Sequence, residues 1–296
     1  ILMVVAVAGA TETGAVDPLD RLYDRMDDWQ TERGWRIWRH VDAAYGGFLG
    51  AMLDGPSEAA LTSETAAALR AMRRSDSITI DPHKLGYVPY ACGAFLAPDA
   101  ERYAVSAFDA PYLDRPELGD GKWTSTLEGS RSAAGAAATW LTAETIGLAA
   151  DGFGALMAAT LDARQAFQTA VRDAVPEARF LPADSNIACF SLARTGEALS
   201  RSNARTGAVF DHFQTSPDFA VSKTTLGRDN AALMASVLAG HDGRDDAADG
   251  HGGMLVIRCV FMNPYWSEPS VRQDLLPRFI KELRQALADA DRAQVA

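Results

Sequence analysis

The sequence predicts an α/β protein in which a mostly parallel sheet is followed by a smaller α+β region. Up to about residue 100, short apolar segments alternate with helical patterns, which is the order expected of βαβ units. After about residue 175 the pattern changes to short strands with one helix between them and another behind them. We therefore expect two domains, residues 1–175 and residues 176–296.

The first strand is predicted at Ile1–Ala8, because its continuous apolar run is typical of a strand covered on both faces of a parallel sheet. Asp17-Pro18 is expected to supply the N-cap and first-turn proline of a helix that runs to Gly34. Arg131–Ala150 is rich in small residues, so we expect it to pack closely against something large. Apolar spacing predicts strands at Trp35–Val41, Ser77–Ile80 and Ala91–Leu96 and helices at Ala59–Arg73 and Gly152–Val175.

The second part is predicted to hold three strands and two helices. Between them lies the acidic, Gly-rich segment 239–253, whose two histidines have neither calcium-loop nor zinc spacing. We expect a solvated hairpin loop there and no metal site. The predicted strands are Asn186–Leu192, Phe219–Thr225 and Met254–Met262, and the helices are Glu197–Phe213 and Glu268–Ala290.

Charge and composition limit the partners. The 296 residues include 28 Lys+Arg and 39 Asp+Glu, a net charge of −11. A chain this acidic is not expected to bind nucleic acid or anionic membranes. The longest apolar run is Ile1–Ala8, well short of the ~20 residues that cross a bilayer. Three widely spaced cysteines without a CxxC motif indicate reduced thiols and a cytoplasmic protein.

Three polar segments follow predicted parallel strands, at the edge of the sheet where open α/β proteins bind ligands. They are the GATETG loop, HVDAAYGG with Asp42, and SITIDPHKLGY with His83 and Lys84. A buried Asp42–Lys84 ion pair is one interpretation. The small residues after Asp42, however, leave space for a flat ring, and the Asp81-Pro82 turn directs Lys84. Such a lysine suits Schiff-base chemistry, and a carboxylate is the known partner of a pyridoxal phosphate ring nitrogen.

The paired motifs HVDAAYGG and DPHK resemble those of the group II pyridoxal-phosphate-dependent amino-acid decarboxylases, which have the aspartate-aminotransferase fold (fold type I). AGATETGAVDPLD is similar to that family's AGTT…GAxD segment, with Ala10 in place of the first threonine. DPHKLGYVPYACGAF, TLEGSRSAAGAAATW and VIRCVFMNPY look most like the bacterial tyrosine decarboxylases. The resemblance implies that residues 1–175 are the C-terminal part of the large cofactor domain, and that an upstream half is cut off or is supplied by a second polypeptide.

The resemblance also implies roles for individual residues. Lys84 would form the Schiff base with pyridoxal 5′-phosphate, Asp42 would pair with the ring nitrogen and Ala44 would pack on the ring. Thr11 would lie near the cofactor, and His83 would hold the phosphate or relay a proton.

Four further residues complete the predicted site. Tyr112, in the loop 104–128, would be the proton donor, with a surface tyrosine as the alternative. Gly129 and Ser130 would reach a phosphate from a helix N-terminus, although Ser130 could be a simple N-cap. Arg258 would contact the substrate, or instead pair with an acidic residue of the protein.

The predicted activity is decarboxylation of an aromatic L-amino acid such as tyrosine, because Tyr87, Tyr90 and Phe108 lie near the motifs. Glutamate or aspartate is the alternative substrate class, and oxidative deamination or transamination would use the same ring chemistry. Two other hypotheses are a subunit of a split decarboxylase and a non-catalytic binding homologue. The expected partner is a second copy in a homodimer, or a chain that supplies the N-terminal half.

Overall fold

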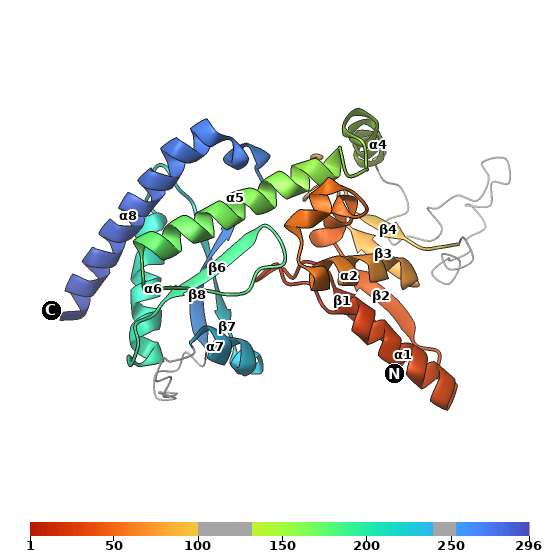
Figure 1. Ribbon diagram of the computed structural model, residues 1–296, viewed down its shortest axis with the longest axis horizontal. Coiled ribbons are helices and arrows are strands. Elements are labelled where there is room, and N and C mark those ends of the chain that lie inside the picture. Colours follow the sequence, from red (N-terminus) through yellow and green to blue (C-terminus); the bar gives the residue numbers. More distant parts are fainter. Residues whose placement is uncertain (100–131, 239–252, 296) are drawn as a thin grey trace.

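The computed structural model describes residues 1–99, 132–238 and 253–295, and these form two sheets (Figure 1). The first sheet has the order β1-β2-β3-β4, in which the first three strands are parallel and β4 is antiparallel to β3. The second sheet has the order β5-β6-β8-β7 and is antiparallel throughout. The strands are β1 (Met3–Val7), β2 (Trp38–Asp42), β3 (Ser77–Ile80), β4 (Ala94–Leu96), β5 (Ala178–Phe180), β6 (Ile187–Leu192), β7 (Ser222–Leu226) and β8 (Met254–Val260).

Helices cover one face of the first sheet. Leu19, Tyr23 and Met26 of α1 are buried in one apolar cluster with Ala6 of β1 and Val41 of β2. This burial is what the helical spacing of the α1 apolar residues requires. The helical segments of this part are α1 (Leu19–Arg33), η1 (Gly46–Met52), η2 (Pro56–Ala60), α2 (Ser63–Ala71), η3 (Met72–Arg74) and α4 (Ala134–Ile146).

A core of aromatic rings fills the second sheet region. The Phe167 ring on α5 lies 5.0 Å from Phe261, 5.1 Å from Phe279 and 6.3 Å from Phe190, measured between ring centroids. Helix α5 also packs against η1, so it connects the two sheets, as Figure 1 shows. The helical segments here are α5 (Phe153–Ala174), α6 (Leu199–Phe213), η6 (Arg228–Asn230), α7 (Ala231–Val237), η8 (Pro264–Ser267) and α8 (Pro269–Val295).

Most predicted elements are confirmed, and the predicted α/β class is the observed one. β3 has the predicted bounds, and α1, α5 and α6 lie within a few residues of theirs. The predicted helix at Ala59–Arg73 is instead three segments, because Thr62 caps a new helix by accepting a hydrogen bond from the Thr65 backbone N–H at 3.1 Å. β5 and α7 were not predicted. The domain boundary at residue 175 stays a prediction.

Two predictions near the N-terminus are wrong. Asp17 is not an N-cap: Pro18 takes that position, and the Asp17 carboxylate accepts a hydrogen bond from the Val7 backbone N–H at 2.8 Å. β1 is not covered on both faces, because it is the outer strand of the first sheet as described, and Met3 and Val5 are about half exposed.

The face of the first sheet opposite α1 is open among the residues the structure describes. Met3 is 51%, Val5 48% and Phe95 47% exposed, and all three lie on this face by strand register. His40 lies between them, with its Nδ1 2.8 Å from Ser77 Oγ. Parallel sheets are normally covered on both faces. This face is therefore one that another polypeptide surface can cover.

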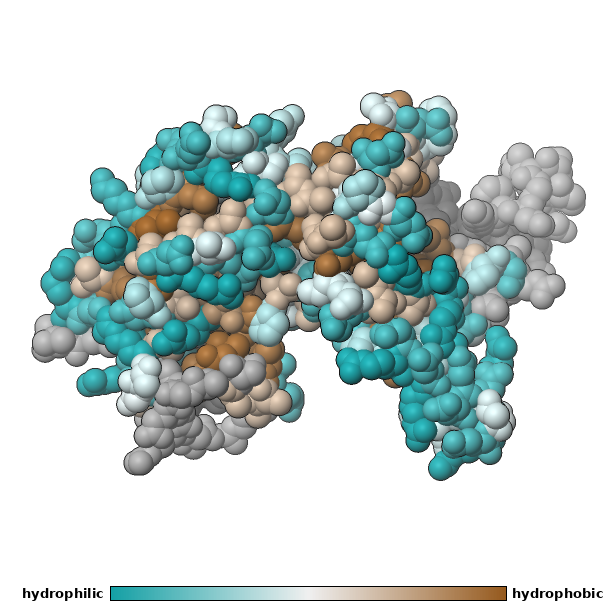
Figure 2. All heavy atoms as spheres, in the orientation of Figure 1, coloured by the Kyte–Doolittle hydropathy of each residue, from teal (hydrophilic) through white to brown (hydrophobic). Residues whose placement is uncertain are grey.

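Helix α4 also departs from its expected packing. None of its side chains is buried among the described residues, and Trp140 is 65% exposed. In Figure 2 hydrophobic residues gather at the upper right, where Figure 1 places α4, whereas the α1 end at the lower right is mainly hydrophilic. In the part of the chain that is described, no helix combines the length and apolarity needed to cross a membrane.

Replacement of Phe167 by Ala is expected to lower the free energy of unfolding by about 3–5 kcal/mol, because it removes a buried ring that contacts several others. Urea denaturation measures this change. Tyr265→Ala is the control, since Tyr265 is 70% exposed and should cost less than about 0.5 kcal/mol. Equal losses in the two variants would contradict the assigned core.

The open face also predicts a pH dependence. Burial lowers the pKa of His40 below 6.5, against the opposing effect of the Asp42 charge. The folded protein therefore favours the neutral imidazole, so this stabilisation is present above about pH 6.5 and is lost as the pH falls through the folded-state pKa. In denaturation at about pH 7 and about pH 5, His40→Gln should lose less stability on acidification than the wild type. The same loss in both proteins would be evidence against the prediction.

Candidate functional site

Three loops meet at the C-terminal edge of the first sheet. Val7 of β1 pairs with Asp42 of β2, which pairs with Thr79 of β3, so the loops after these strands begin side by side. The Asp81 backbone N–H donates to the Ala44 carbonyl at 3.2 Å, which joins the second loop to the third. The parallel register thus brings together the three segments that carry the predicted site residues.

Asp42 presents an exposed carboxylate at the end of β2. One of its oxygens, Oδ1, accepts a hydrogen bond from the Ala44 backbone N–H at 3.1 Å. This bond fixes the start of the turn that follows the strand, and Ala44 itself is half-buried. A carboxylate at this position can accept a proton or a hydrogen bond from a ligand lying at the sheet edge.

Lys84 follows β3 in a turn closed by its own backbone N–H, which donates to the Asp81 carbonyl at 2.9 Å. Its ammonium nitrogen lies 3.0 Å from Asp81 Oδ2, and its side chain is 31% exposed. The ion pair considered from the sequence, Asp42–Lys84, is not among those of the described residues. Sequence reasoning treated Asp81 only as part of a turn, although its i,i+3 spacing to Lys84 was a usable signal.

His83 is held by the chain around it. Its Nδ1 lies 2.5 Å from the Cys92 carbonyl oxygen and 3.2 Å from the Cys92 backbone nitrogen, so this ring nitrogen is engaged by the Cys92 backbone. Its Nε2 lies 3.6 Å from Asp81 Oδ2, and its ring stacks on Tyr90 with centroids 4.2 Å apart. The Nδ1 position is therefore occupied, and Nε2 is the nitrogen that can exchange a proton.

Thr11 is exposed in the turn after β1, beside Glu12, whose carbonyl accepts a hydrogen bond from Cys189 Sγ at 3.3 Å. No pattern in the sequence indicates this contact between the first loop and β6. Burial raises the pKa of the Cys189 thiol to about 12, so the thiol stays a donor.

Arg258 lies on β8, paired in register with Cys189. Its Nη1 donates to Ser222 Oγ at 3.3 Å, whereas its Nε is buried without a hydrogen-bond partner in the structure. Burial raises the pKa of Tyr45 well above its usual value, and the positive charge of Arg258 opposes this rise. Arg258 is therefore close enough to the Asp42 turn to act on it electrostatically.

Three predicted site residues, Tyr112, Gly129 and Ser130, lie outside the described residues, as do the rest of the loop 104–128, Phe108 and most of the acidic segment 239–253. Their roles stay predictions. Among the described residues the structure shows no cluster of His, Cys, Asp or Glu that could hold a metal ion.

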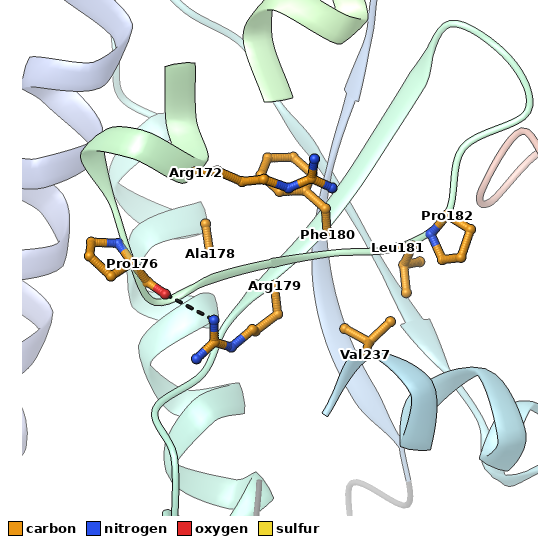
Figure 3. Close-up of a pocket in the computed structure, with 8 residues that line it drawn as sticks. All are labelled: Arg172, Pro176, Ala178, Arg179, Phe180, Leu181, Pro182 and Val237. Carbon is orange, nitrogen blue, oxygen red and sulfur yellow. Dashed lines mark hydrogen bonds between the residues drawn. The ribbon is translucent and has the colours of Figure 1, made fainter. Parts of the chain in front are cut away.

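A groove of about 640 Å³ lies elsewhere, between the end of α5, β5 and α7 (Figure 3). Two arginines line it. Arg172 stacks over the Phe180 ring at 5.0 Å, and Arg179 donates to the Pro176 carbonyl at 3.1 Å. Because the groove contains neither Lys84 nor Asp42, it is not the candidate site.

Comparison with known proteins places this geometry in a family. The model of the pyridoxal-dependent decarboxylase conserved domain matches residues 1–193. An L-tyrosine decarboxylase of Enterococcus faecium is 34% identical over 191 residues, which is 57% of this chain and 31% of that protein. An L-2,4-diaminobutyrate decarboxylase of Rhizobium meliloti is 33% identical over 177 residues, 57% of this chain and 31% of that protein.

The fold is shared with longer proteins. A crystal structure of Oryza sativa TDC with PLP and tryptamine superposes with a TM-score of 0.66 at 19% identity, covering 95% of this chain and 51% of that chain. The present chain thus spans about a third to a half of the proteins it matches. Asp42, Lys84 and the three loops all lie within the matched residues 1–193, and the chain belongs to the pyridoxal-dependent decarboxylase family.

Proposed function

We propose that this chain takes part in the pyridoxal-phosphate-dependent decarboxylation of an L-amino acid, with an aromatic amino acid such as tyrosine as the substrate. The observation that carries the proposal is the placement of Lys84 and Asp42 at the ends of adjacent parallel strands. An amine and a carboxylate at one sheet edge match the two ends of the cofactor that need a protein partner, its aldehyde and its ring nitrogen.

The residues present fit the cofactor. Bound pyridoxal phosphate supplies a protonated ring that accepts electrons from a bond broken at the substrate Cα. Lys84 provides the amine that attaches it, and Asp81 holds that amine in place at 3.0 Å. Asp42 keeps the ring nitrogen protonated, while the small side chain of Ala44 leaves space for the ring. Thr11 lies exposed in the loop after β1, at the same edge.

His83 is proposed to hold or move a proton through Nε2, because its Nδ1 is engaged by the Cys92 backbone. Gly129 and Ser130 are proposed to hold the phosphate, and Tyr112 to return a proton to the substrate Cα.

Aromatic residues beside Lys84 support an aromatic substrate. Tyr90 is 80% exposed and stacks on His83. Tyr87 is half-buried: its hydroxyl donates to the Met262 carbonyl at 2.7 Å, and its ring stacks on Phe153. Arg258 is proposed to face the substrate. Its buried Nε without a partner favours the second candidate, an acidic amino acid whose side-chain carboxylate that guanidinium would bind.

The open face of the first sheet supports a partner. Met3, Val5 and Phe95 are about half exposed, and α4 has no buried side chain among the described residues. We propose that a second copy, or a polypeptide equivalent to the unmatched half of the relatives, covers these surfaces. The three cysteines are free thiols in the structure, which fits a reducing, cytoplasmic location.

Incubation with pyridoxal phosphate followed by borohydride reduction should place the adduct on Lys84, because its amine lies at the sheet edge. Peptide mass spectrometry locates the adduct among four lysines, Lys84, Lys122, Lys223 and Lys281. Lys84→Ala should lose it, whereas Lys281→Ala on α8 should keep it. A specific adduct on Lys223 or Lys281, retained in Lys84→Ala, would refute the assignment of the nucleophile.

Substrate choice is tested by comparing turnover of L-tyrosine, L-glutamate and L-2,4-diaminobutyrate by the loaded protein. We expect L-tyrosine to be preferred, and Arg258→Gln to raise KM with a smaller effect on kcat, because a group that binds the substrate uniformly acts on KM. Arg278→Gln is the control, since Arg278 pairs with Asp218 on the surface. Preference for L-glutamate, abolished in Arg258→Gln, would replace the aromatic assignment with the acidic one.

A further inference from the structure

A buried polar chain connects the turn after Asp42 to the second sheet. The Tyr45 hydroxyl donates to Asn186 Oδ1 at 2.6 Å, and Asn186 Nδ2 donates to Thr160 Oγ1 and to the Phe261 carbonyl, each at 3.2 Å. Tyr45 is 8% exposed, and Asn186 and Thr160 are fully buried.

The direction of each bond is fixed. The Asn186 amide nitrogen gives both of its protons, so its oxygen must accept, and the Tyr45 hydroxyl must be the donor. Thr160 Oγ1 donates in turn to the Met157 carbonyl at 2.7 Å. Burial raises the pKa of Tyr45, so the hydroxyl keeps its proton at neutral pH. The hydrogen bonds from Tyr45 to Met157 therefore have one set of donor and acceptor directions.

One end of this polar chain lies in the turn after β2, and the other end lies beside β6 of the second sheet. Tyr45 follows Ala44 directly and is three residues from Asp42, in a turn whose Gly46 N–H donates to the Ala8 carbonyl at 2.9 Å. Asn186 immediately precedes β6, and its carbonyl accepts a hydrogen bond from the Phe261 N–H at 3.0 Å, just beyond β8. A displacement of the second sheet would therefore move the turn that carries the carboxylate.

We propose that Tyr45 and Asn186 are positioning residues that set the orientation of Asp42 and Ala44 from the second sheet. This inference rests on the proposed function, because it takes Asp42 as the partner of the cofactor ring. Neither residue reaches the ligand in this arrangement; both act through the turn.

Neighbouring hydrogen bonds also join the segment before and within β6 to the first part of the chain. Asp184, two residues before Asn186, accepts hydrogen bonds from the Val16 N–H at 3.0 Å and from the Thr65 hydroxyl at 3.1 Å. Cys189 donates to the Glu12 carbonyl in the first loop. The segment 184–189 thus holds the first and second loops, and the Tyr45–Asn186 bond is its link to the turn that carries Asp42.

The test compares Tyr45→Phe with Tyr23→Phe. Tyr23 is a matched control, because its hydroxyl is also fully buried and lies 2.8 Å from a side-chain oxygen, that of Ser75. That bond lies at the opposite end of the strands from Asp42. Both variants keep the ring and lose one buried hydrogen bond, so both should lower Tm to a similar extent.

Amide hydrogen exchange of the chain without cofactor is the first measurement. In Tyr45→Phe, exchange of the peptide spanning residues 42–47 should rise about tenfold, the factor that matches one lost buried hydrogen bond. In Tyr23→Phe it should rise no more than in the rest of the chain. Equal exchange at residues 42–47 in the two variants would overturn the proposal.

The second measurement uses protein incubated with pyridoxal phosphate. Tyr45→Phe should keep the yield of the borohydride-trapped Lys84 adduct but lose at least half of the cofactor's induced circular dichroism, because the ring is attached but no longer held in one orientation (on the order of a twofold loss). Tyr23→Phe should keep both. An unchanged dichroism in Tyr45→Phe would overturn the proposal. If the wild type gave no Lys84 adduct, the proposed function would fail, and the exchange measurement would still decide the positioning role.

Discussion

The close approach of two backbone segments at Gly9 and Gly46 is the constraint on which the site depends. The Gly46 N–H donates to the Ala8 carbonyl at 2.9 Å, and a Cβ on Gly46 would lie 2.5 Å from that oxygen. Gly9 has a φ of +90°, and a Cβ there would lie 2.7 Å from the Gly46 nitrogen. Any side chain at either position would separate the first loop from the turn after Asp42. The parallel pairing of β1 with β2 brings these loops to the same edge, and the two glycines let them touch.

Two further hydrogen bonds connect this contact to the rest of the site. The turn after Asp42 is joined to the loop of Lys84 through the Ala44 carbonyl, and to the second sheet through Tyr45. These hydrogen bonds hold the three loops to one another and to the second sheet. The Asp42 carboxylate and part of the Lys84 side chain stay exposed at this edge.

The charges at the site are arranged locally rather than across it. Lys84 pairs with Asp81, its neighbour in the same turn, and this leaves the carboxylate of Asp42 for another partner. In a direct Asp42–Lys84 ion pair the two charges would neutralise each other, and neither group would be available to a ligand. Because Asp81 pairs with the lysine, the two strand ends stay available for the separate roles proposed above. Among the described residues, β1, β4 and α4 leave apolar side chains exposed, which is consistent with the proposed cover by further polypeptide.

The sequence by itself determined the motifs and most of the strands and helices, since apolar periodicity and turn residues act locally. Ser77–Ile80, the α1 helix and the positions of Asp42 and Lys84 were all predictable in this way. It could not determine that β1 is an outer strand or that Asp17 bonds to Val7, because each depends on which segments become neighbours. The Tyr45–Asn186 bond joins residues 141 positions apart and carries no local signal. Only the tertiary structure decides such contacts, since they form where the two sheets and α5 pack against one another.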